Sequence, residues 1–423
     1  PVRCEVVHSD CAVTSAFESD SEMLNWLYDA YIRTQLSNMH SGVPSDCPHI
    51  ERLGYTGDGQ LCCEAAMMLL DSQKFYQKWL EDISDCQSTD NGHVQHTAPF
   101  MGGGGGPAGW GGAIAVVPYE MYKIYGDRET FRRYLPKILR YFDYLDSRSS
   151  GGLVCREEQG GWCLGDWCTP EPIAICEPFV NTALCVKQML MTKEAAEAIG
   201  EKETAQMLGR HIEEKRQAIL NAYYSPQTGS FIGDVQGANS FATDIGLGGE
   251  RTYENTRKKY SAADSFDTGI FGTDILTRVL FERGDANTAF RLLTSEGKGS
   301  FYNMKKQGAT TIWENWDGER SHSHPMFGAA TRYLFSFILG ITQEKTSAGY
   351  EHILIAPQIP DGLNYASGHI TTVRGKISVT FKRTESGADF YVTVPQRARF
   401  TYGSGCEFEL RDGENHIHID FEE

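Results

Sequence analysis

The sequence predicts a mostly helical protein that ends in a small β domain: an (α/α)6 barrel followed by an antiparallel β-sandwich. Two observations predict this fold class. From about residue 20 to residue 341, apolar side chains recur at helical spacing, in about twelve segments. From Tyr350 onward the apolar period changes to two, which is typical of strands. Helical segments in that number favour hairpins that close into a ring, with an inner helix layer buried against an outer layer.

Four apolar stripes represent the helical part. A Ser19/Glu22 pattern before the first stripe predicts a capping box, and the second stripe follows Asp127. Each stripe predicts a helix with one face toward a core. The stripes are Met23, Leu24, Leu27, Tyr28, Tyr31 and Ile32; Phe131, Leu135, Ile138, Phe142 and Leu145; Leu208, Ile212, Ile219 and Leu220; and Phe327, Ala330, Leu334, Phe335 and Ile338.

Alternation of apolar and polar residues predicts strands in the last roughly 75 residues. Residues 1–17 also read as extended, and such an edge usually pairs with something. We therefore expect an extended segment over 1–17, the remnant or linker of an upstream β domain, a barrel over 18–345 and a β-sandwich over 346–423. The alternating runs are Ile353 and Ile355; Ile377, Val379 and Phe381; Phe390, Val392 and Val394; and Ile417, Ile419 and Phe421.

Composition limits the possible partners. The chain has 423 residues and a formal net charge of −17, which argues against nucleic acid and against anionic lipid, because both reward clustered Lys and Arg. The sequence contains no apolar run long enough for a transmembrane helix, so no membrane partner is expected. A chain with this negative charge is better suited to neutral or cationic ligands than to polyanions. The sequence leaves the oligomeric state open.

The cysteine pattern bears on metals and on compartment. Twelve cysteines lie at irregular spacings, and the tightest group, Cys155 to Cys176, lacks the paired C-x-x-C motifs of a zinc site. We expect free buried thiols, no metal and no cofactor. Free thiols favour a cytoplasmic location. The chain opens on Pro1 without a charged-then-apolar leader, and a periplasmic or secreted protein whose leader has been removed would look similar.

The stretch "SDCPHIERLGYTGDGQ", residues 45–60, places Asp46, Glu51 and Asp58 in one glycine-punctuated segment. Its proline and glycines predict an ordered loop over 45–57, with a helix restarting near Asp58. A single acid here would be a helix cap or a surface ion pair. Three acids together favour sugar chemistry, because carboxylates accept hydrogen bonds from hydroxyls and a protonated carboxyl can cleave a glycosidic bond.

A second segment, "TTIWENWDGERSHSHPMFG" over 310–328, places Glu314 between Trp313 and Trp316, with His324 nearby. Two interpretations stay open. Glu314 can lie at a helix end beside two core tryptophans, or the aromatic rings can stack on sugar faces. His324 alone is more often a structural histidine than a functional one.

Two further segments fit the rim of a pocket. "MGGGGGPAGWGG" over 101–112 has five glycines before Trp110, and "GGWCLGDWCTPEP" over 160–172 carries Trp162, Asp166 and Trp167. The glycine run is not a phosphate loop, because the Lys and Ser/Thr of that motif do not follow it. A loop that allows close approach and presents Trp110 is the better interpretation.

These segments resemble conserved blocks of the α-L-rhamnosidases, glycoside hydrolase family 78. "DCPHIERLGYTGDGQ" resembles the D-C-P-x-R-x-E-R-L-G-W-T-G-D block, and "TTIWENWDG" resembles the T-T-x-W-E-x-W-D-G block. "GWGGAIAVVPYEMYKIYGD", "GDW" and "HPMFG" have counterparts in the same order along the chain. The resemblance covers nearly the whole chain, and its two acid blocks are specific.

The resemblance implies hydrolysis of terminal α-L-rhamnosyl residues with inversion at the anomeric carbon. It implies that Glu51 is the general acid and Glu314 the general base. The other residues that we expect to bind the rhamnose-containing substrate are Asp46, Arg52, Tyr55, Asp58, Trp110, Trp167, Trp313 and His324.

Three departures from the family pattern stand out. Ile50 replaces a polar residue beside the acid and is expected to desolvate Glu51, which would favour its protonated form. Tyr55 replaces a tryptophan, and the link from Glu314 to His324 is short, which is expected to reshape the aglycone side. Two alternatives stay open: another (α/α)6 glycosidase, such as a glucosidase or uronyl hydrolase, and a non-enzymatic sugar-binding relative.

Overall fold

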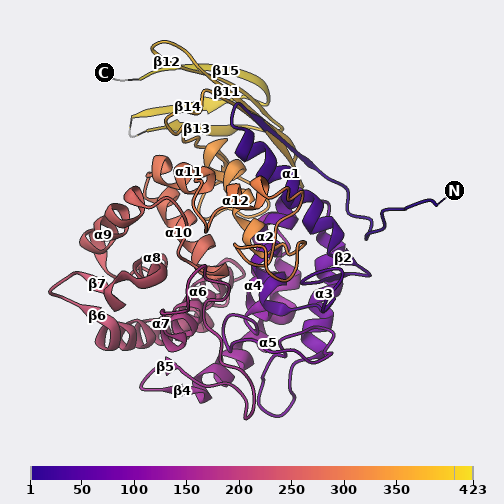
Figure 1. Ribbon diagram of the computed structural model, residues 1–423, viewed down its shortest axis with the longest axis vertical. Helices are drawn as coiled ribbons and strands as arrows, with labels where there is room; N and C mark the ends of the chain where they lie inside the picture. Colours follow the sequence, from indigo (N-terminus) through magenta and orange to yellow (C-terminus); the bar gives the residue numbers. More distant parts are fainter. Residues whose placement is uncertain (1, 404, 422–423) are drawn as a thin grey trace.

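The structure is a computed structural model that describes residues 2–403 and 405–421. Helices dominate the chain as far as Ile338, and long strands follow (Figure 1). The helices are α1 (Glu22–Ser37), α2 (Thr56–Leu69), α3 (Gln73–Asp85), α4 (Ala113–Tyr125), α5 (Arg128–Ser147), α6 (Glu177–Ala198), α7 (Lys202–Tyr223), α8 (Ala238–Asp244), α9 (Gly249–Ala262), α10 (Ile270–Glu282), α11 (Ala286–Thr294) and α12 (Phe301–Lys306). Two 3-10 segments, η1 (Ile232–Gly237) and η2 (Met326–Thr331), and a π-helical segment, η3 (Leu334–Ile338), complete this part.

The helices form a closed double ring. Helices α2, α4, α6, α8 and α10 pack each on the next, α10 packs on η2, and η2 packs back on α2. Helices α1, α3, α5, α7, α9 and α11 lie outside this inner ring, as Figure 1 shows. The chain therefore alternates between the outer and the inner layer, and the predicted (α/α)6 barrel is confirmed.

Burial follows the layer to which a helix belongs. Inner helix α2 buries nearly every position, because it has neighbours on both sides and an outer helix behind it. Outer helix α5 buries Phe131, Ile138 and Leu145 with the rest of their stripe and exposes its other face. The stripes that predicted these helices therefore mark the faces that meet the core.

The first helix begins later than its sequence pattern predicts. Its N-cap is Ser21, whose hydroxyl accepts the N–H of Leu24 at 3.4 Å. Ser19 ends strand β1 (Ser15–Ser19) instead, and its hydroxyl donates to Asn25 Oδ1 at 3.0 Å. The predicted Ser19/Glu22 capping box is therefore wrong, because strand pairing extends as far as Ser19.

The β domain contains two sheets. The first has the antiparallel order β1-β10-β11-β12-β15, and the second has the order β14-β13-β9-β8. One pair in the second sheet, β9 with β13, is parallel, which is a departure from the predicted antiparallel arrangement. The strands are β8 (Ile341–Gln343), β9 (Ile353–Ile355), β10 (Tyr365–Thr372), β11 (Gly375–Arg383), β12 (Gly387–Val394), β13 (Ala398–Tyr402), β14 (Cys406–Leu410) and β15 (Gly413–Asp420). Short hairpins within the helical part are β2 (Met39–His40) with β3 (Val43–Pro44), β4 (Ser149–Ser150) with β5 (Leu153–Val154), and β6 (Tyr224–Ser225) with β7 (Ser230–Phe231).

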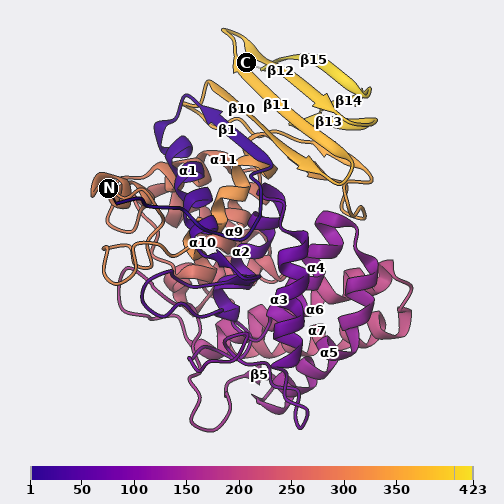
Figure 2. The ribbon, with the colours of Figure 1, turned by 90° about the vertical axis from the view of Figure 1, so that its right-hand side faces the viewer.

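The N-terminal strand ties the β domain to the barrel. Strand β1 pairs with β10 in antiparallel register, with Phe17 opposite Gly368. The Phe17 ring lies 5.8 Å from the Phe335 ring and 6.3 Å from the Tyr28 ring, measured between centroids. The strands therefore lie against one side of the barrel (Figure 2), and one hydrophobic core continues from the helices into the sheets.

Within residues 2–403 and 405–421, every helix is too short or too polar to cross a membrane. All twelve cysteines are free thiols, and six of them are buried: Cys11, Cys47, Cys62, Cys63, Cys168 and Cys185.

Candidate active site

A cavity of about 470 Å³ lies at the end of the barrel where the inner helices α2 and α10 begin. Most of its ionisable groups come from two segments far apart in the sequence, residues 46–58, which run into the first turn of α2, and residues 314–324 before η2. The fold therefore brings both acid-bearing segments to one place. Eight of the predicted residues line this cavity: Asp46, Glu51, Tyr55, Asp58, Trp110, Trp167, Glu314 and His324.

Two of the predicted residues are not in the cavity wall. Arg52 is exposed, in a left-handed backbone conformation with φ of 56°. Trp313 is buried and stacks on His322, with ring centroids 4.1 Å apart. Trp316 is also in the core, stacked on Phe266. The two tryptophans therefore pack in the core as one interpretation expects, but Glu314 lies in a loop and not at a helix end.

The loop before α2 closes on itself around Asp46. The Asp46 N–H donates to the Leu53 carbonyl at 3.0 Å, and the Leu53 N–H donates to Asp46 Oδ1 at 2.8 Å. Asp46 Oδ2 is buried and has no hydrogen-bond partner among the described residues. This oxygen is free to bind a hydroxyl group of a ligand.

Burial raises the pKa of Asp46 to about 7, and the neighbouring carboxyls of Asp58 and Glu51 act in the same direction. The adjacent Cys47 thiol and the charge of His324 oppose the rise. Near neutral pH the Asp46 carboxyl therefore carries a proton part of the time.

Replacing Asp46 by Asn is expected to raise the free energy of unfolding above that of wild type, and this gain should be larger at pH 8 than at pH 4. A raised folded-state pKa means that the folded protein binds more protons than the unfolded chain, so wild-type stability falls as pH rises from about 4 to about 7. The whole shift corresponds to at most about 4 kcal/mol. Thermal unfolding of Asp46→Asn and wild type across this range measures it, with exposed Asp143→Asn as control. Parallel curves for Asp46→Asn and wild type would contradict the expectation.

Asp58 lies in the first turn of α2, three residues after the N-cap Tyr55, so helix α2 begins slightly earlier than predicted. Its Oδ1 lies 2.7 Å from His324 Nε2, and Nδ1 of the same ring lies 3.8 Å from Glu314 Oε2. Burial opposes charge on His324, but the hydrogen bond and charge of Asp58 together with the charges of Glu314 and Asp46 outweigh it and raise the pKa of the imidazole. Asp58 is therefore a partner of His324 across the cavity rather than a helix cap.

Arg320 bridges the two predicted catalytic acids. Its Nε lies 2.9 Å from Glu314 Oε1, and its Nη2 lies 3.3 Å from Glu51 Oε1. The N–H of Ser321 donates to Glu314 Oε2 at 3.1 Å, so both oxygens of the Glu314 carboxylate are held. The sequence prediction missed Arg320. It lies six residues after Glu314 in the short link, and only the turn of that link brings it over the cavity.

Ile50 does not desolvate the acid as expected. Its side chain is 48% exposed, and the Glu51 side chain is 36% exposed. Both residues lie at the tip of the loop, where solvent reaches them. The prediction that Ile50 favours a protonated Glu51 through burial is therefore wrong.

The glycine run explains how aromatic rings come to line the cavity. A Cβ added at Gly105 would lie 2.5 Å from the Trp110 ring, and one added at Gly57 would lie 2.7 Å from the same ring. Trp110 is thus held between two backbone segments that only glycine allows so close. Trp162 also lines the cavity, and a Cβ added at Gly104 would lie 2.5 Å from its ring.

Replacing Gly57 by Ala is expected to push the Trp110 ring into the cavity, because Gly105 packs against the other side of the ring. For the α-L-rhamnoside hydrolysis that the sequence predicts, kcat/KM should then fall about 10- to 100-fold. Overpacking should also cost about 1–3 kcal/mol of stability. Gly209→Ala in α7 is the matched control, because its Cβ would meet only Lys193 Cε at 3.7 Å. An unchanged KM and kcat in Gly57→Ala would show that the position of Trp110 does not matter.

Asp166 of the "GDW" segment has a structural role. Its carboxylate accepts the backbone N–H groups of Gly269 at 2.7 Å, Phe271 at 2.9 Å and Gly272 at 3.2 Å, at the start of α10. Burial raises its pKa to about 6, although these hydrogen bonds oppose the rise. The segment between Asp166 and α10 is thereby fixed, and with it Trp167 and Ile270 in the cavity wall.

A larger cavity, about 820 Å³, lies at the other end of the inner helices. Its charged groups are largely paired: Arg332 lies 2.7 Å from Glu64 and 2.8 Å from Asp274. None of the predicted site residues lines it. The chemistry predicted from the sequence therefore belongs to the smaller cavity.

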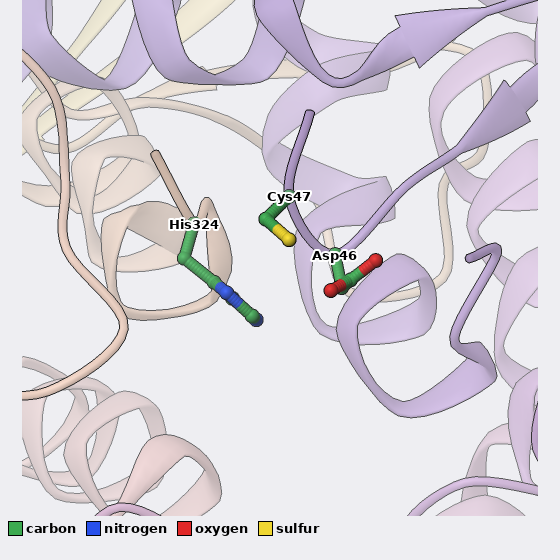
Figure 3. Close-up of side chains that lie close together, drawn as sticks. All are labelled: Asp46, Cys47 and His324. Atoms are coloured by element: carbon green, nitrogen blue, oxygen red, sulfur yellow. The ribbon is translucent and has the colours of Figure 1, made fainter. Parts of the chain in front are cut away.

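Asp46, Cys47 and His324 lie close enough together to be compared with a metal site (Figure 3). Burial and the charge of Asp46 raise the pKa of the Cys47 thiol, which disfavours the thiolate that a metal needs. His324 Nε2 is already paired with Asp58. These contacts favour an acid and hydroxyl-binding cluster over a metal site.

The chain matches two family models. Residues 12–338 match the bacterial alpha-L-rhamnosidase 6 hairpin glycosidase domain, and residues 340–401 match the bacterial alpha-L-rhamnosidase C-terminal domain. The first match covers most of the chain, including both acid-bearing loops. Both domains agree with the barrel and the β-sandwich of the fold.

Similar proteins agree with this match. The α-L-rhamnosidase of Alteromonas sp. (strain LOR) is 27% identical over 427 residues, covering 93% of this chain and 45% of that protein. The α-L-rhamnosidase of Streptomyces avermitilis is 29% identical over 414 residues, covering 93% of this chain and 39% of that protein. The chain therefore spans less than half the length of these curated relatives.

Two solved structures have the same fold. The Streptomyces avermitilis α-L-rhamnosidase complexed with L-rhamnose superposes with a TM-score of 0.88 at 26% identity, covering 98% of this chain and 43% of that chain. The α-L-rhamnosidase from Dictyoglumus thermophilum superposes with a TM-score of 0.90 at 21% identity, covering 99% of this chain and 52% of that chain. At that lower identity the second likeness shows the fold alone.

Proposed function

Because the chain belongs to the bacterial α-L-rhamnosidase six-hairpin glycosidase family, we propose that it hydrolyses terminal α-L-rhamnosyl residues from glycosides, oligosaccharides or polysaccharides. The relatives that carry this activity in their names are more than twice as long as this chain, so the activity of this chain is itself part of the proposal. We also propose a cytoplasmic location, which the twelve free thiols support.

One observation carries the proposal: Glu51 and Glu314 line one cavity and contact one guanidinium, that of Arg320. Glycoside hydrolysis needs two carboxyl groups on either side of the scissile bond. Glu51, at the exposed tip of its loop, protonates the departing oxygen as general acid. Glu314, buried and held by Arg320 and the Ser321 N–H, accepts the proton of the attacking water as general base.

An inverting reaction is the form of this mechanism that we propose. One guanidinium contacts both carboxylates, so the two acids face a single cavity. Inverting enzymes separate their carboxyl groups by roughly 6.5–9.5 Å to admit a water, whereas retaining enzymes need about 5 Å. The predicted separation of 6.5–9.5 Å stays a prediction, and the stereochemistry of the product tests it.

The cavity wall offers suitable groups for the sugar. Asp46 Oδ2 has no partner among the described residues and can accept from a hydroxyl, and the Asp58–His324 pair can bind another. Trp110, Trp167 and Tyr55 present aromatic surface. Arg320 keeps its shorter contact with Glu314 and gives up its longer one with Glu51 when the glycosidic oxygen reaches the acid.

Two measurements test the proposal. In a screen of p-nitrophenyl glycosides, α-L-rhamnoside should be cleaved fastest, and proton NMR should show β-L-rhamnose before mutarotation. Cleavage of a glucoside or a uronide instead would favour another glycosidase on this fold. Binding of rhamnose without cleavage of any glycoside would favour a sugar-binding protein. An α-anomer appearing first would contradict the role of Glu314 while leaving the substrate intact.

A further inference from the structure

Two histidines and a glutamate meet beside the candidate active site. His93 and His96 lie in the loop between α3 and α4, and Glu157 lies between β5 and α6. Their ligating atoms all lie within 4.8 Å of one another, and the three residues are only 7–8% exposed. His96 also lines the cavity that holds Glu51 and Glu314. Tertiary structure alone assembles this cluster, so the sequence pattern did not predict it.

The spacing of the three groups suits a tetrahedral ion. His93 Nε2 lies 3.4 Å from Glu157 Oε1, and His96 Nε2 lies 2.9 Å from Glu157 Oε2. Ligands of a tetrahedral zinc at bond lengths of about 2.0–2.1 Å lie about 3.3 Å apart. Glu157 thus presents a separate oxygen to each imidazole, and rotation of the His93 ring and the carboxylate would bring Oε2 and both Nε2 atoms around one ion.

Hydrogen bonds account for both oxygens of Glu157 but not for the ring nitrogen Nε2 of His93. The Tyr144 hydroxyl and the Glu158 N–H both donate to Glu157 Oε1, and His96 occupies Oε2. His93 Nε2 is buried and has no hydrogen-bond partner among the described residues. A buried ring nitrogen without a partner costs free energy, and a metal ion beside it would supply the missing partner.

We propose that His93, His96 and Glu157 form a binding site for a divalent transition metal ion, with Zn²⁺ the best match. Two imidazoles and one carboxylate are a set that zinc accepts with tetrahedral geometry, and they are less suited to Ca²⁺ or Mg²⁺, which prefer oxygen ligands. Tyr144 and the Glu158 N–H then hold the carboxylate from behind through Oε1, as outer partners of metal ligands commonly do.

The ion would fasten the wall of the active site. The His96 carbonyl accepts the Thr56 N–H at 2.9 Å, at the start of helix α2, and Thr97 pairs with Tyr55 in a β-bridge. The loop that carries Glu157 continues to Trp162, which lines the cavity. One ion at the cluster therefore joins two loops of the wall and steadies the segment that enters α2.

The test measures metal directly and does not depend on hydrolysis. The purified full chain is stripped with a chelator, dialysed against Zn²⁺ and analysed for bound zinc by elemental analysis and for thermal stability. Wild type should retain one zinc per chain and unfold at a higher temperature with zinc than without it. The double variant His93→Ala/His96→Ala should lose both effects, and Tyr144→Phe should weaken binding about 10- to 100-fold.

Two features of the chain provide controls. His416 and His418 form an exposed cluster with Asp389 on the β domain, so His416→Ala/His418→Ala should retain zinc as wild type does. Cobalt in place of zinc reports the ligands: a tetrahedral spectrum without thiolate-to-cobalt charge transfer supports imidazole and carboxylate ligands. Recorded on the His416→Ala/His418→Ala variant, this spectrum decides the question even where the His93→Ala/His96→Ala variant does not fold.

Three outcomes overturn the proposal. These are a wild-type chain that retains no zinc, zinc retention that His93→Ala/His96→Ala leaves unchanged, and strong thiolate charge transfer, which would place the ion at cysteines. Zinc binding and glycoside hydrolysis are measured separately, so failure of one leaves the other standing.

Discussion

Replacing Glu314 by Gln is expected to lower kcat/KM about 10²- to 10⁴-fold, and by a similar factor for every α-L-rhamnoside tested. In the proposed mechanism Glu314 acts on the attacking water, whatever group departs. Arg320 and the Ser321 N–H hold the carboxylate in place, and the amide of Gln can no longer accept the proton. Steady-state kinetics on p-nitrophenyl α-L-rhamnoside and on a rhamnosyl disaccharide measure the two factors.

The control for this variant lies in the same loop. Glu319→Gln removes an exposed carboxylate from the link that carries Arg320, so it should leave kcat/KM within about twofold of wild type. Azide needs no base, so it should restore release of p-nitrophenol in Glu314→Ala and yield the β-glycosyl azide. A loss that depends strongly on the leaving group would instead give Glu314 the role of acid.

Replacing Glu51 by Gln is expected to have an effect that depends on the leaving group. A p-nitrophenolate departs with little protonation, so its hydrolysis should fall only modestly, whereas hydrolysis of a rhamnosyl disaccharide should fall about 10²- to 10⁴-fold. The ratio of the two losses is the diagnostic quantity. It separates a missing proton donor from a general loss of binding, which would lower both reactions equally.

Asp46 is the competitor for the role of acid, because its pKa lies at about 7 and its carboxyl neighbours Glu51. Asp46→Asn therefore belongs in the same experiment. If Asp46→Asn shows the strong dependence on the leaving group and Glu51→Gln shows none, the donor is Asp46. Similar losses on both substrates for Asp46→Asn would agree with a residue that holds a sugar hydroxyl.

Much of the fold could be predicted from the sequence, because helical and strand periodicities record which faces of a segment meet a core. The stripe of α5 and the alternation of β11 and β12 are buried as their patterns indicate. The start of α1 was misplaced by the Ser19/Glu22 pattern, because pairing of β1 with a strand about 350 residues away competes with a local cap.

In the candidate site, too, some residues could be predicted from the sequence and others could not. Glu51, Glu314, Asp46 and Asp58 were predicted because several acids among glycines and tryptophans are unusual on a solvated surface, and all four line one cavity. Trp313 was also predicted to bind substrate, but its ring is buried against His322 outside the cavity wall, since a tryptophan packs equally well in a core or on a sugar. Only the positions of its neighbours decide between the two.

By itself the sequence determined the layers of the barrel, the strands of the β domain and the acids available for catalysis, since these depend on residue type and local spacing. Tertiary structure decided which groups meet. It brought Arg320 between Glu51 and Glu314 and placed Trp110 between Gly57 and Gly105. It also gathered His93, His96 and Glu157. Such contacts join segments far apart in the chain, and their free energy depends on burial and on partners that local spacing does not specify.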